Sequence, residues 1–169
     1  MRLISARLSA LALALALAGC SSSPVGLNLS GEPGFYKKLN ATTAKVDAAE
    51  ARDMISIYRA NQGLSRLSVD PALQMAAEEQ VLAMARADTM SHEIGGTLMS
   101  RLDGRLEHTR AVENISAGYH TLAEAFSGWR DSPSHNKNML NPDMRRMGIA
   151  TAYVPESKYK VYWALILTD

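Results

Sequence analysis

The chain has 169 residues, 47% of them hydrophobic, and is therefore long enough to bury a substantial core. Its 18 Lys and Arg residues nearly balance 17 Asp and Glu residues, which excludes the strongly basic surface expected of a nucleic-acid-binding protein. Its single cysteine excludes a disulfide within the chain, so the fold must be stabilised by its apolar core.

Residues 1–19 have the features of an export signal. Arg2 and Arg7 precede an apolar run over residues 8–18, and small residues follow. Because the run is shorter than the roughly 20 residues that a membrane-spanning helix needs, we expect the segment to be removed. Its removal takes away two positive charges and changes the formal charge from +1 to about −1.

The only cysteine, Cys20, ends the sequence LAGC, where the signal would be cut. This sequence resembles the bacterial lipobox, in which the cysteine is lipidated and becomes the mature N-terminus. Palmitate and related acyl chains would then anchor the protein to a membrane, since each buried methylene contributes about 0.8 kcal/mol. Ser21 implies sorting to the outer membrane in a host that has one. The alternative is an ordinary secretory signal with an incidental cysteine.

The rest of the chain divides into a predicted tether, residues 20–45, and one predicted domain, residues 46–169. Residues 21–34 are rich in Ser, Gly and Pro and have no regular apolar period. From about Val46, apolar residues recur at helical spacing until Gly63 interrupts them. This pattern predicts the first helix of the domain.

The clearest predicted helix begins at Asp70. An aspartate at the N-cap followed by Pro71 in the first turn is a strong start signal. An apolar stripe continues from it, formed by Leu73, Ala77, Val81 and Met84. We expect this helix to end near His92, because two glycines follow, and a short helix to cover residues 98–106.

Two more helix starts follow. Thr121 and Glu124 have the spacing of a capping box, which accounts for Glu124. Ser132 and Pro133 form another start signal, with His135 in the same turn. Ser132 beside His135 could also indicate a serine hydrolase. However, the chain has no G-x-S-x-G motif, and a capping serine explains the pattern.

Two predicted strands end the chain, over residues 147–154 and 159–168. In the second strand both alternating sets of residues are apolar, which indicates a strand covered on both faces. We therefore expect a sheet sandwiched between helices. The two tryptophans and the methionines are expected to fill the core, and His108 and His120 to be exposed.

Five segments together resemble the CAP superfamily of cysteine-rich secretory, antigen 5 and pathogenesis-related 1 proteins. They are NQGLSRLSVDPAL, MSH, ENISAG, GWRDSPSHNKNML and MGIATAY followed by YW, and they follow the family's order over about residues 50–168. The resemblance is to the bacterial, cysteine-poor branch. It implies an α+β fold, a three-layer α-β-α sandwich with a central, mostly antiparallel sheet.

The resemblance also implies a cleft where His92, Glu113 and His135 meet. Two imidazoles and a carboxylate are a donor set for a divalent cation such as zinc. A second glutamate of the family pattern corresponds to Ser132, a poor ligand, so any metal would bind weakly. Ser132 and Asn114 are predicted to line the cleft. In the alternative, the histidines are hydrogen-bonded cleft residues, and no metal binds.

Three functions remain open at this point. The first is a monomeric, lipid-anchored binding module that uses the cleft of His92, Glu113 and His135 for a hydrophobic or envelope-derived ligand, such as a lipid or a cell-wall fragment. It is favoured because the chain offers no activated nucleophile. The second is a metal-assisted hydrolase, a peptidase or esterase, although no H-E-x-x-H motif is present. The third is a structural or interaction role in the cell envelope.

Overall fold

A computed structural model describes residues 31–108 and 110–169. The predicted signal and Cys20 lie outside the described residues. The described residues from Gly31 to Asp169 form one compact unit, which includes part of the predicted tether. A 3₁₀ helix, η1 (Gly34–Tyr36), and the buried Leu39 belong to it. None of the described helices is both long and apolar enough to span a membrane.

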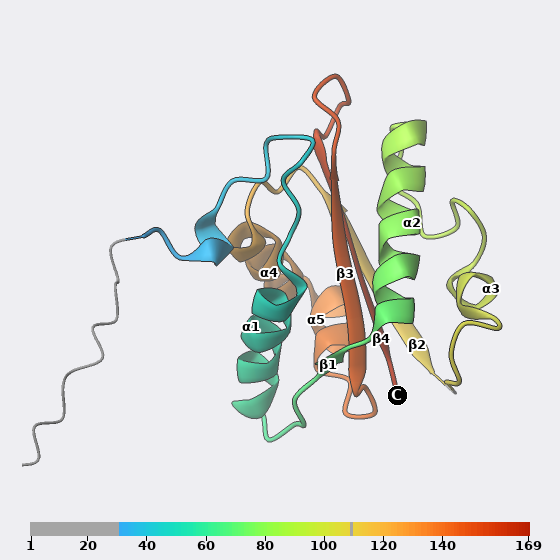
Figure 1. Ribbon diagram of the computed structural model, residues 1–169. Coiled ribbons are helices and arrows are strands. Elements are labelled where there is room, and N and C mark those ends of the chain that lie inside the picture. Colours follow the sequence, from blue (N-terminus) through green and yellow to red (C-terminus); the bar gives the residue numbers. More distant parts are fainter. Residues whose placement is uncertain (1–30, 109) are drawn as a thin grey trace, which may run out of the picture. The chain divides into compact units, whose positions relative to one another are not determined.

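In the part of the chain that the structure describes, four strands form one sheet between two helical layers (Figure 1). Their order across the sheet is β1 (Ser68–Val69), β3 (Arg146–Tyr153), β4 (Val161–Thr168) and β2 (Ala111–Ala117). β4 is antiparallel to both of its neighbours, whereas the short β1 is parallel to β3. The predicted α-β-α sandwich with a mostly antiparallel sheet is confirmed.

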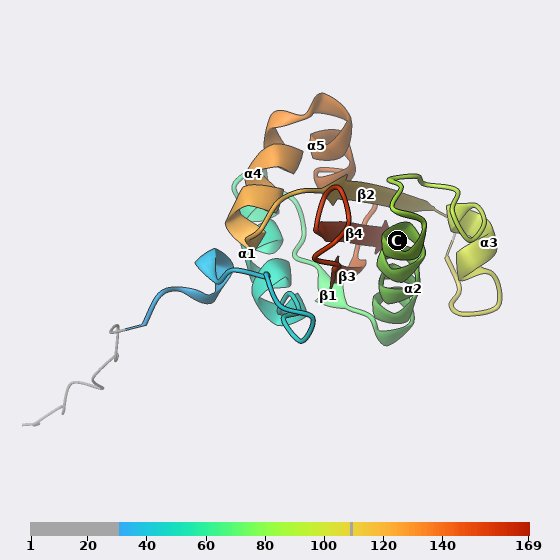
Figure 2. The same cartoon turned by 90° about the horizontal axis from the view of Figure 1, so that it is seen from above.

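One helical layer consists of α1 (Ala48–Ala60), α4 (Leu122–Asp131) and α5 (Pro133–Met139) (Figure 2). α4 starts with the predicted capping box, because the Thr121 and Glu124 side chains each accept a hydrogen bond from the other residue's backbone N–H. Under this layer the rings of Trp129 and Trp163 meet edge to face, with centroids 6.2 Å apart. Both tryptophans are core residues, as predicted.

The other layer consists of α2 (Pro71–Ala87) and the short α3 (Leu98–Leu102). The Asp70 carboxylate caps α2 by accepting hydrogen bonds from two backbone N–H groups of the first turn. α2 ends earlier than predicted because Asp88 adopts the left-handed conformation, with φ of 45°. α3 also ends four residues before the predicted residue 106.

Small residues on β3 allow α2 to lie close to the sheet. Gly148, Ala150 and Ala152 alternate along the face of β3 that is turned toward α2. A Cβ atom added at Gly148 would lie 2.2 Å from the backbone carbonyl carbon of Leu73, which no side chain tolerates. The α2 layer can therefore pack directly on the backbone of β3.

β4 is buried along its whole length. One of its faces belongs to the core under α1 and α4 and contributes Val161, Trp163, Leu165 and Leu167. The opposite face belongs to the core under α2 and contributes Tyr162, Ala164 and Ile166. The strand that is apolar on both faces is thus central and covered on both sides, as predicted.

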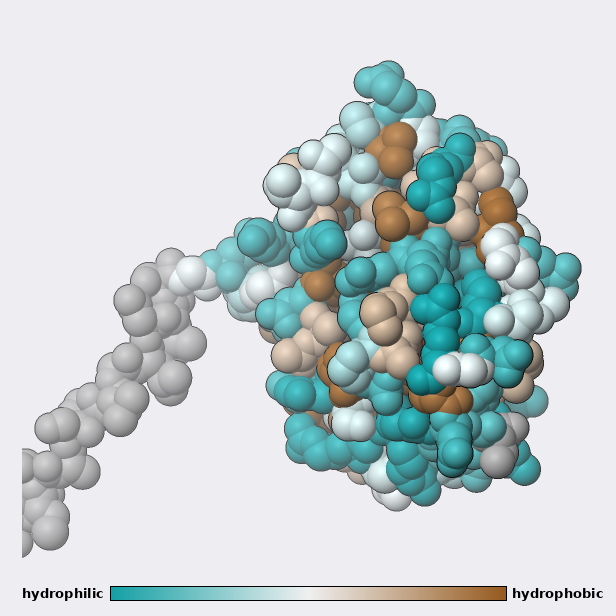
Figure 3. All heavy atoms as spheres, turned by 45° about the vertical axis from the view of Figure 1, so that its right-hand side comes forward, coloured by the Kyte–Doolittle hydropathy of each residue, from teal (hydrophilic) through white to brown (hydrophobic). Residues whose placement is uncertain are grey.

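The outer surface of the α2 side is mostly hydrophilic, with small separate apolar patches (Figure 3). The prediction that the methionines fill the core is wrong for Met75 and Met90, which are 53% and 48% exposed. It is correct for four fully buried residues, Met84, Met139, Met144 and Met147. His108 and His120 are partly buried rather than exposed.

Candidate functional site

A buried carboxylate, that of Glu113 on β2, lies at the centre of the candidate site. Its side chain is only 2% exposed, and each carboxylate oxygen has a partner. Oε2 lies 2.8 Å from Nδ1 of His92, and Oε1 accepts a 2.8 Å hydrogen bond from Nη2 of Arg101. Because His92 follows α2 and Arg101 belongs to α3, Glu113 fastens this whole segment to the sheet.

Arg101 is the residue of this site that no sequence pattern indicated. It is buried, and besides Glu113 it bonds the loop that carries His92. Its Nη2 and Nε donate to the backbone oxygens of His92 and Gly96, both at 3.3 Å. A buried arginine is expected to have partners, but the sequence does not reveal that Arg101 is buried. Arg101 therefore neutralises the carboxylate and also positions His92.

His135 lies on α5, near His92. Burial, reinforced by the charge of His92, lowers the pKa of His135 below the ordinary histidine value. The structure therefore brings the two histidines and Glu113 into one neighbourhood, although they come from three separate segments. At neutral pH the His135 imidazole is uncharged, which leaves one ring nitrogen as a hydrogen-bond acceptor.

A pair of asparagines fixes the His135 turn against β2. Nδ2 of Asn114 donates to the backbone oxygen of His135 at 3.0 Å. Nδ2 of Asn138 donates to the backbone oxygen of Glu113 at 3.1 Å and to Oδ1 of Asn114 at 2.9 Å. Asn114 is 1% exposed. It acts as a buried connection between the strand and α5.

Ser132, the other residue predicted to line the cleft, occupies the N-cap position of α5. Its hydroxyl makes no capping hydrogen bond, in contrast to the predicted role. Instead, its Oγ lies 3.4 Å from Oγ of Ser134. Ser132 is partly exposed, and its hydroxyl is available at the start of the helix that carries His135.

The three predicted metal ligands do not fit a metal ion as a set. Both oxygens of Glu113 are bonded, and the adjacent Arg101 guanidinium would repel a divalent cation. Among residues 31–108 and 110–169, no group of three or more His, Cys, Asp or Glu side chains is arranged to hold a metal ion. The Glu113 carboxylate instead holds the His92 imidazole, beside the partly buried His135.

The lowered pKa of His135 predicts that acid destabilises the fold. A histidine whose pKa is lower in the folded state than in the unfolded state binds fewer protons when folded. The free energy of unfolding should therefore decrease as the pH falls below about 6.5. We expect thermal melts to show this decrease, and His135→Asn to make it smaller. Equal slopes in the wild-type and His135→Asn proteins would contradict the assignment.

A three-layer sandwich with two histidines and a buried glutamate beside β2 defines a CAP-type domain. Residues 52–167 match the model of the CAP family, described as the cysteine-rich secretory protein family, and the chain belongs to this family. The match covers the site and all the elements of the sheet. The family predicted from the five sequence segments is confirmed.

Curated relatives come from two bacteria, Bacillus subtilis and Borreliella burgdorferi. YkwD of Bacillus subtilis is 28% identical over 128 residues, which cover 71% of this chain and 50% of YkwD. The Bacillus subtilis membrane protein YlbC is 29% identical over 117 residues, which cover 68% of this chain and 33% of YlbC. The chain thus spans half or less of the length of these two relatives. A protein of Borreliella burgdorferi is 27% identical over 115 residues, covering 64% of this chain and 73% of that protein.

Solved structures of the same fold include two exported proteins. An extracellular protein containing an SCP domain, from Bacillus anthracis, superimposes with a TM-score of 0.63 and 26% identity, covering 72% of this chain and 39% of that one. An outer surface protein from Borrelia burgdorferi gives a TM-score of 0.66, with 74% and 96% coverage. Its 21% identity shows the fold alone.

Proposed function

We propose that this protein is an exported, lipid-anchored binding module that holds an apolar ligand between α1 and α4. The proposal is carried by a cavity of about 690 Å³ between these two helices. Sites for small molecules are typically clefts of roughly 300–1,000 Å³ with mostly apolar walls and a few polar groups. The cavity has these properties, and its chemistry indicates the kind of ligand.

Apolar and aromatic side chains line most of the cavity. Phe35 of η1 and Phe126 of α4 face a row of α1 residues that includes Met54, Ile57 and Tyr58. The rings of Tyr58 and Phe126 pack edge to face, with centroids 5.4 Å apart, and so join α1 to α4 at this wall. These surfaces are suited to an acyl chain or another flexible hydrocarbon.

Two acidic side chains, those of Glu50 and Asp53, also line the cavity. A ligand carboxylate would be repelled by them, because like charges at short range are unfavourable. These carboxylates disfavour a free fatty acid, and the ligand that we propose is an uncharged lipid such as a glyceride.

The cavity is connected to the Glu113 site through one hydrogen bond. The Tyr58 hydroxyl donates to Oδ1 of Asn136 at 2.9 Å, and Asn136 directly follows His135 on α5. We therefore assign the hydrophobic part of the ligand to the α1–α4 cavity. The two histidines form a separate polar site on the neighbouring helix and loop.

Export and anchoring are proposed from the N-terminal sequence. Residues 1–19 would direct export, and Cys20 would carry the acyl chains that hold the domain at a membrane surface. Two structural neighbours, an extracellular protein and an outer surface protein, support export. An anchored domain with an apolar cavity could bind a lipid or another hydrophobic envelope component close to the membrane.

A metal-assisted hydrolase is less well supported. That mechanism needs an ion that activates water. Here the Glu113 carboxylate is bonded to Arg101 and His92 and is not free to join two imidazoles around an ion. The geometry therefore favours binding over hydrolysis.

Ile57→Glu should weaken lipid binding at least tenfold. Ile57 is 55% exposed and lines the cavity, so the substitution places a charge against the acyl chain without disturbing the core. A tenfold loss corresponds to about 1.4 kcal/mol, a modest cost for desolvating a carboxylate. The measurement is a titration with a monoacylglycerol whose acyl chain carries a fluorophore.

Met75→Glu is the matched control. Met75 is 53% exposed and lies on α2, in the opposite layer, so this variant should bind the monoacylglycerol as the wild-type protein does. Absence of binding by the wild-type protein, or equal affinities of both variants, would refute the cavity as the ligand site.

A further inference from the structure

We propose that the groove between α2 and the loop before α1 binds an extended peptide segment of a partner protein, which adds to the sheet as a strand beside β3. This function is separate from the lipid cavity, which lies on the other face of the sheet between α1 and α4. The proposal is based on the backbone groups at the edge of β3, on the two walls of the groove and on the side chains that line it.

β3 has an open edge beyond its pairing with β1. The two-residue β1 covers β3 as far as Met147. The next residue that faces outward, Ile149, exchanges two hydrogen bonds with the Gln74 side chain, at 2.8 and 3.1 Å. In an antiparallel ladder the backbone groups of alternate residues point to the same side, so those of Thr151 and Tyr153 also face away from β4.

These four backbone groups have no partner within residues 31–108 and 110–169. The N–H and C=O groups of Thr151 and Tyr153 form a short row of donors and acceptors. Thr151 is 8% exposed, so its backbone groups are largely removed from bulk water. Buried backbone groups without a partner are costly, and a bound strand would satisfy them.

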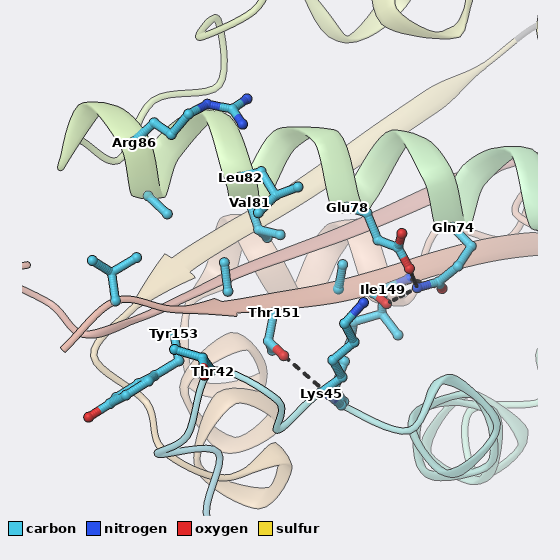
Figure 4. A pocket seen from close by; sticks show the side chains of 15 residues that line it. Thr42, Lys45, Gln74, Glu78, Val81, Leu82, Arg86, Ile149, Thr151 and Tyr153 are labelled. Carbon is cyan, nitrogen blue, oxygen red and sulfur yellow. Dashed lines mark hydrogen bonds between the residues drawn. The ribbon is translucent and has the colours of Figure 1, made fainter.

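The open edge is the floor of a groove of about 510 Å³ (Figure 4). α2 forms one wall, and the loop that contains Thr42 and Lys45 forms the other. The backbone N–H of Val46 donates to the Thr151 hydroxyl at 3.1 Å, which fastens the loop beside the strand. The edge of β3 is therefore recessed between two walls.

The recess determines which partner can reach the edge. A second copy of this chain cannot pair through the same edge, because two strands that each lie at the bottom of a groove do not meet. A single extended segment can enter, and its backbone matches the alternating donors and acceptors. Three to five extended residues span about 10–17 Å, enough to cover Thr151 and Tyr153.

The side chains on the walls of the groove also indicate which side chains the bound peptide should carry. Val81, Leu82 and Ala85 form an apolar wall that accommodates an aliphatic side chain. Lys45 forms no ion pair with any described residue, and its side chain points into the groove (Figure 4). Glu78 on the facing wall is engaged by Gln74. The groove should therefore select a segment with one acidic and one aliphatic side chain.

A phage-displayed library of random heptapeptides, selected on the protein, tests the proposal. Enriched peptides should lose binding to Leu82→Arg, which places a long charged side chain on the apolar wall. We expect a synthetic enriched peptide to bind Tyr153→Pro at least tenfold more weakly, because proline removes a donor at the edge. Tyr153→Thr keeps that donor and should bind within about threefold of the wild-type protein.

N-methylation of the peptide provides a test that does not depend on any protein variant. Methylation at alternate peptide bonds should abolish binding, and methylation at the intervening bonds should be tolerated, since only every second residue faces β3. Failure to enrich any peptide, or a methylation pattern without this period of two, would overturn the proposal. The proposal would also be overturned if the wild-type protein self-associates and Leu82→Arg abolishes this self-association. That result would show that a second copy of the chain occupies the groove.

Discussion

Arg59→Met should lower the free energy of unfolding by about 4 kcal/mol or more. Arg59, on α1, is fully buried, and its guanidinium donates to four backbone oxygens, those of Ser65, Met139, Asn141 and Met144. Burial, together with the charge of Arg145, lowers the pKa of Arg59. The carbonyl dipoles thus replace the water that the guanidinium loses.

The large effect is expected because the four backbone carbonyl groups lose their donor when Arg59 is replaced. Three of the four acceptors lie at the last residue of α5 and in the segment that links α5 to β3, so the side chain joins this part of the chain to α1. Methionine fills much of the space but donates no hydrogen bond. Each buried acceptor left unpaired costs about 1–3 kcal/mol.

Urea unfolding at neutral pH measures this loss. Arg59→Lys should be intermediate, because an ammonium group cannot reproduce the planar arrangement of donors. Arg52→Met on the same helix is the control. The Arg52 guanidinium pairs with its exposed neighbour Asp53, so its removal should cost less than about 1 kcal/mol. Equal stabilities of the Arg59 and Arg52 variants would contradict the prediction.

The second large effect concerns the buried ion pair of the candidate site. Glu113→Gln should destabilise the protein by about 3–5 kcal/mol, because it leaves the Arg101 guanidinium buried without its counter-charge. The glutamine preserves the shape of the side chain, so packing should change little. The loop that carries His92 should become more mobile as well, because the Glu113 carboxylate bonds both His92 and Arg101.

A double-mutant cycle separates the pair from its surroundings. The double variant Glu113→Gln/Arg101→Met should lose less free energy of unfolding than the sum of the two single variants. The difference should be about 1 kcal/mol or more, as for other residues in direct contact. Urea unfolding of the four proteins gives the coupling energy, and amide hydrogen exchange reports on residues 92–102. Additive losses would show that the ion pair is not the source of the effect.

The elements that could be predicted from the sequence have local signals. Two helix starts were predictable from at most four consecutive residues each. Asp70 and Pro71 mark the start of α2, and Thr121 and Glu124 mark the start of α4. β4 was recognisable because both of its alternating sets are apolar. In each case the residues that carry the signal are also the residues that form the element.

β2 was not predicted, because polar residues of the candidate site interrupt its apolar pattern. Glu113 and Asn114 occupy adjacent positions that would otherwise carry apolar residues, so the strand lacks a regular alternation. It is fixed by its ladder with β4 instead, where Ile115 pairs with Ala164. Functional sites are where sequence patterns are expected to fail, because chemistry replaces packing there.

The candidate site was likewise only partly predictable. The resemblance to the CAP family singled out His92, Glu113 and His135, but it treated the glutamate as a ligand. Its actual partners, Arg101 and His92, reach it only because α3 folds back on β2, a contact that spacing along the chain does not reveal. The same holds for the Tyr58–Asn136 hydrogen bond between the cavity and α5.

The position of β4 in the sheet has a consequence for biosynthesis. β4 is the last strand of the described fold in chain order, yet it lies between β2 and β3 and contributes to both cores. A ribosome-bound chain that stops short of Val161 has no strand to join the two halves, so it cannot complete the domain. The growing polypeptide would therefore stay incompletely folded until β4 has been synthesised and can pair with both neighbouring strands.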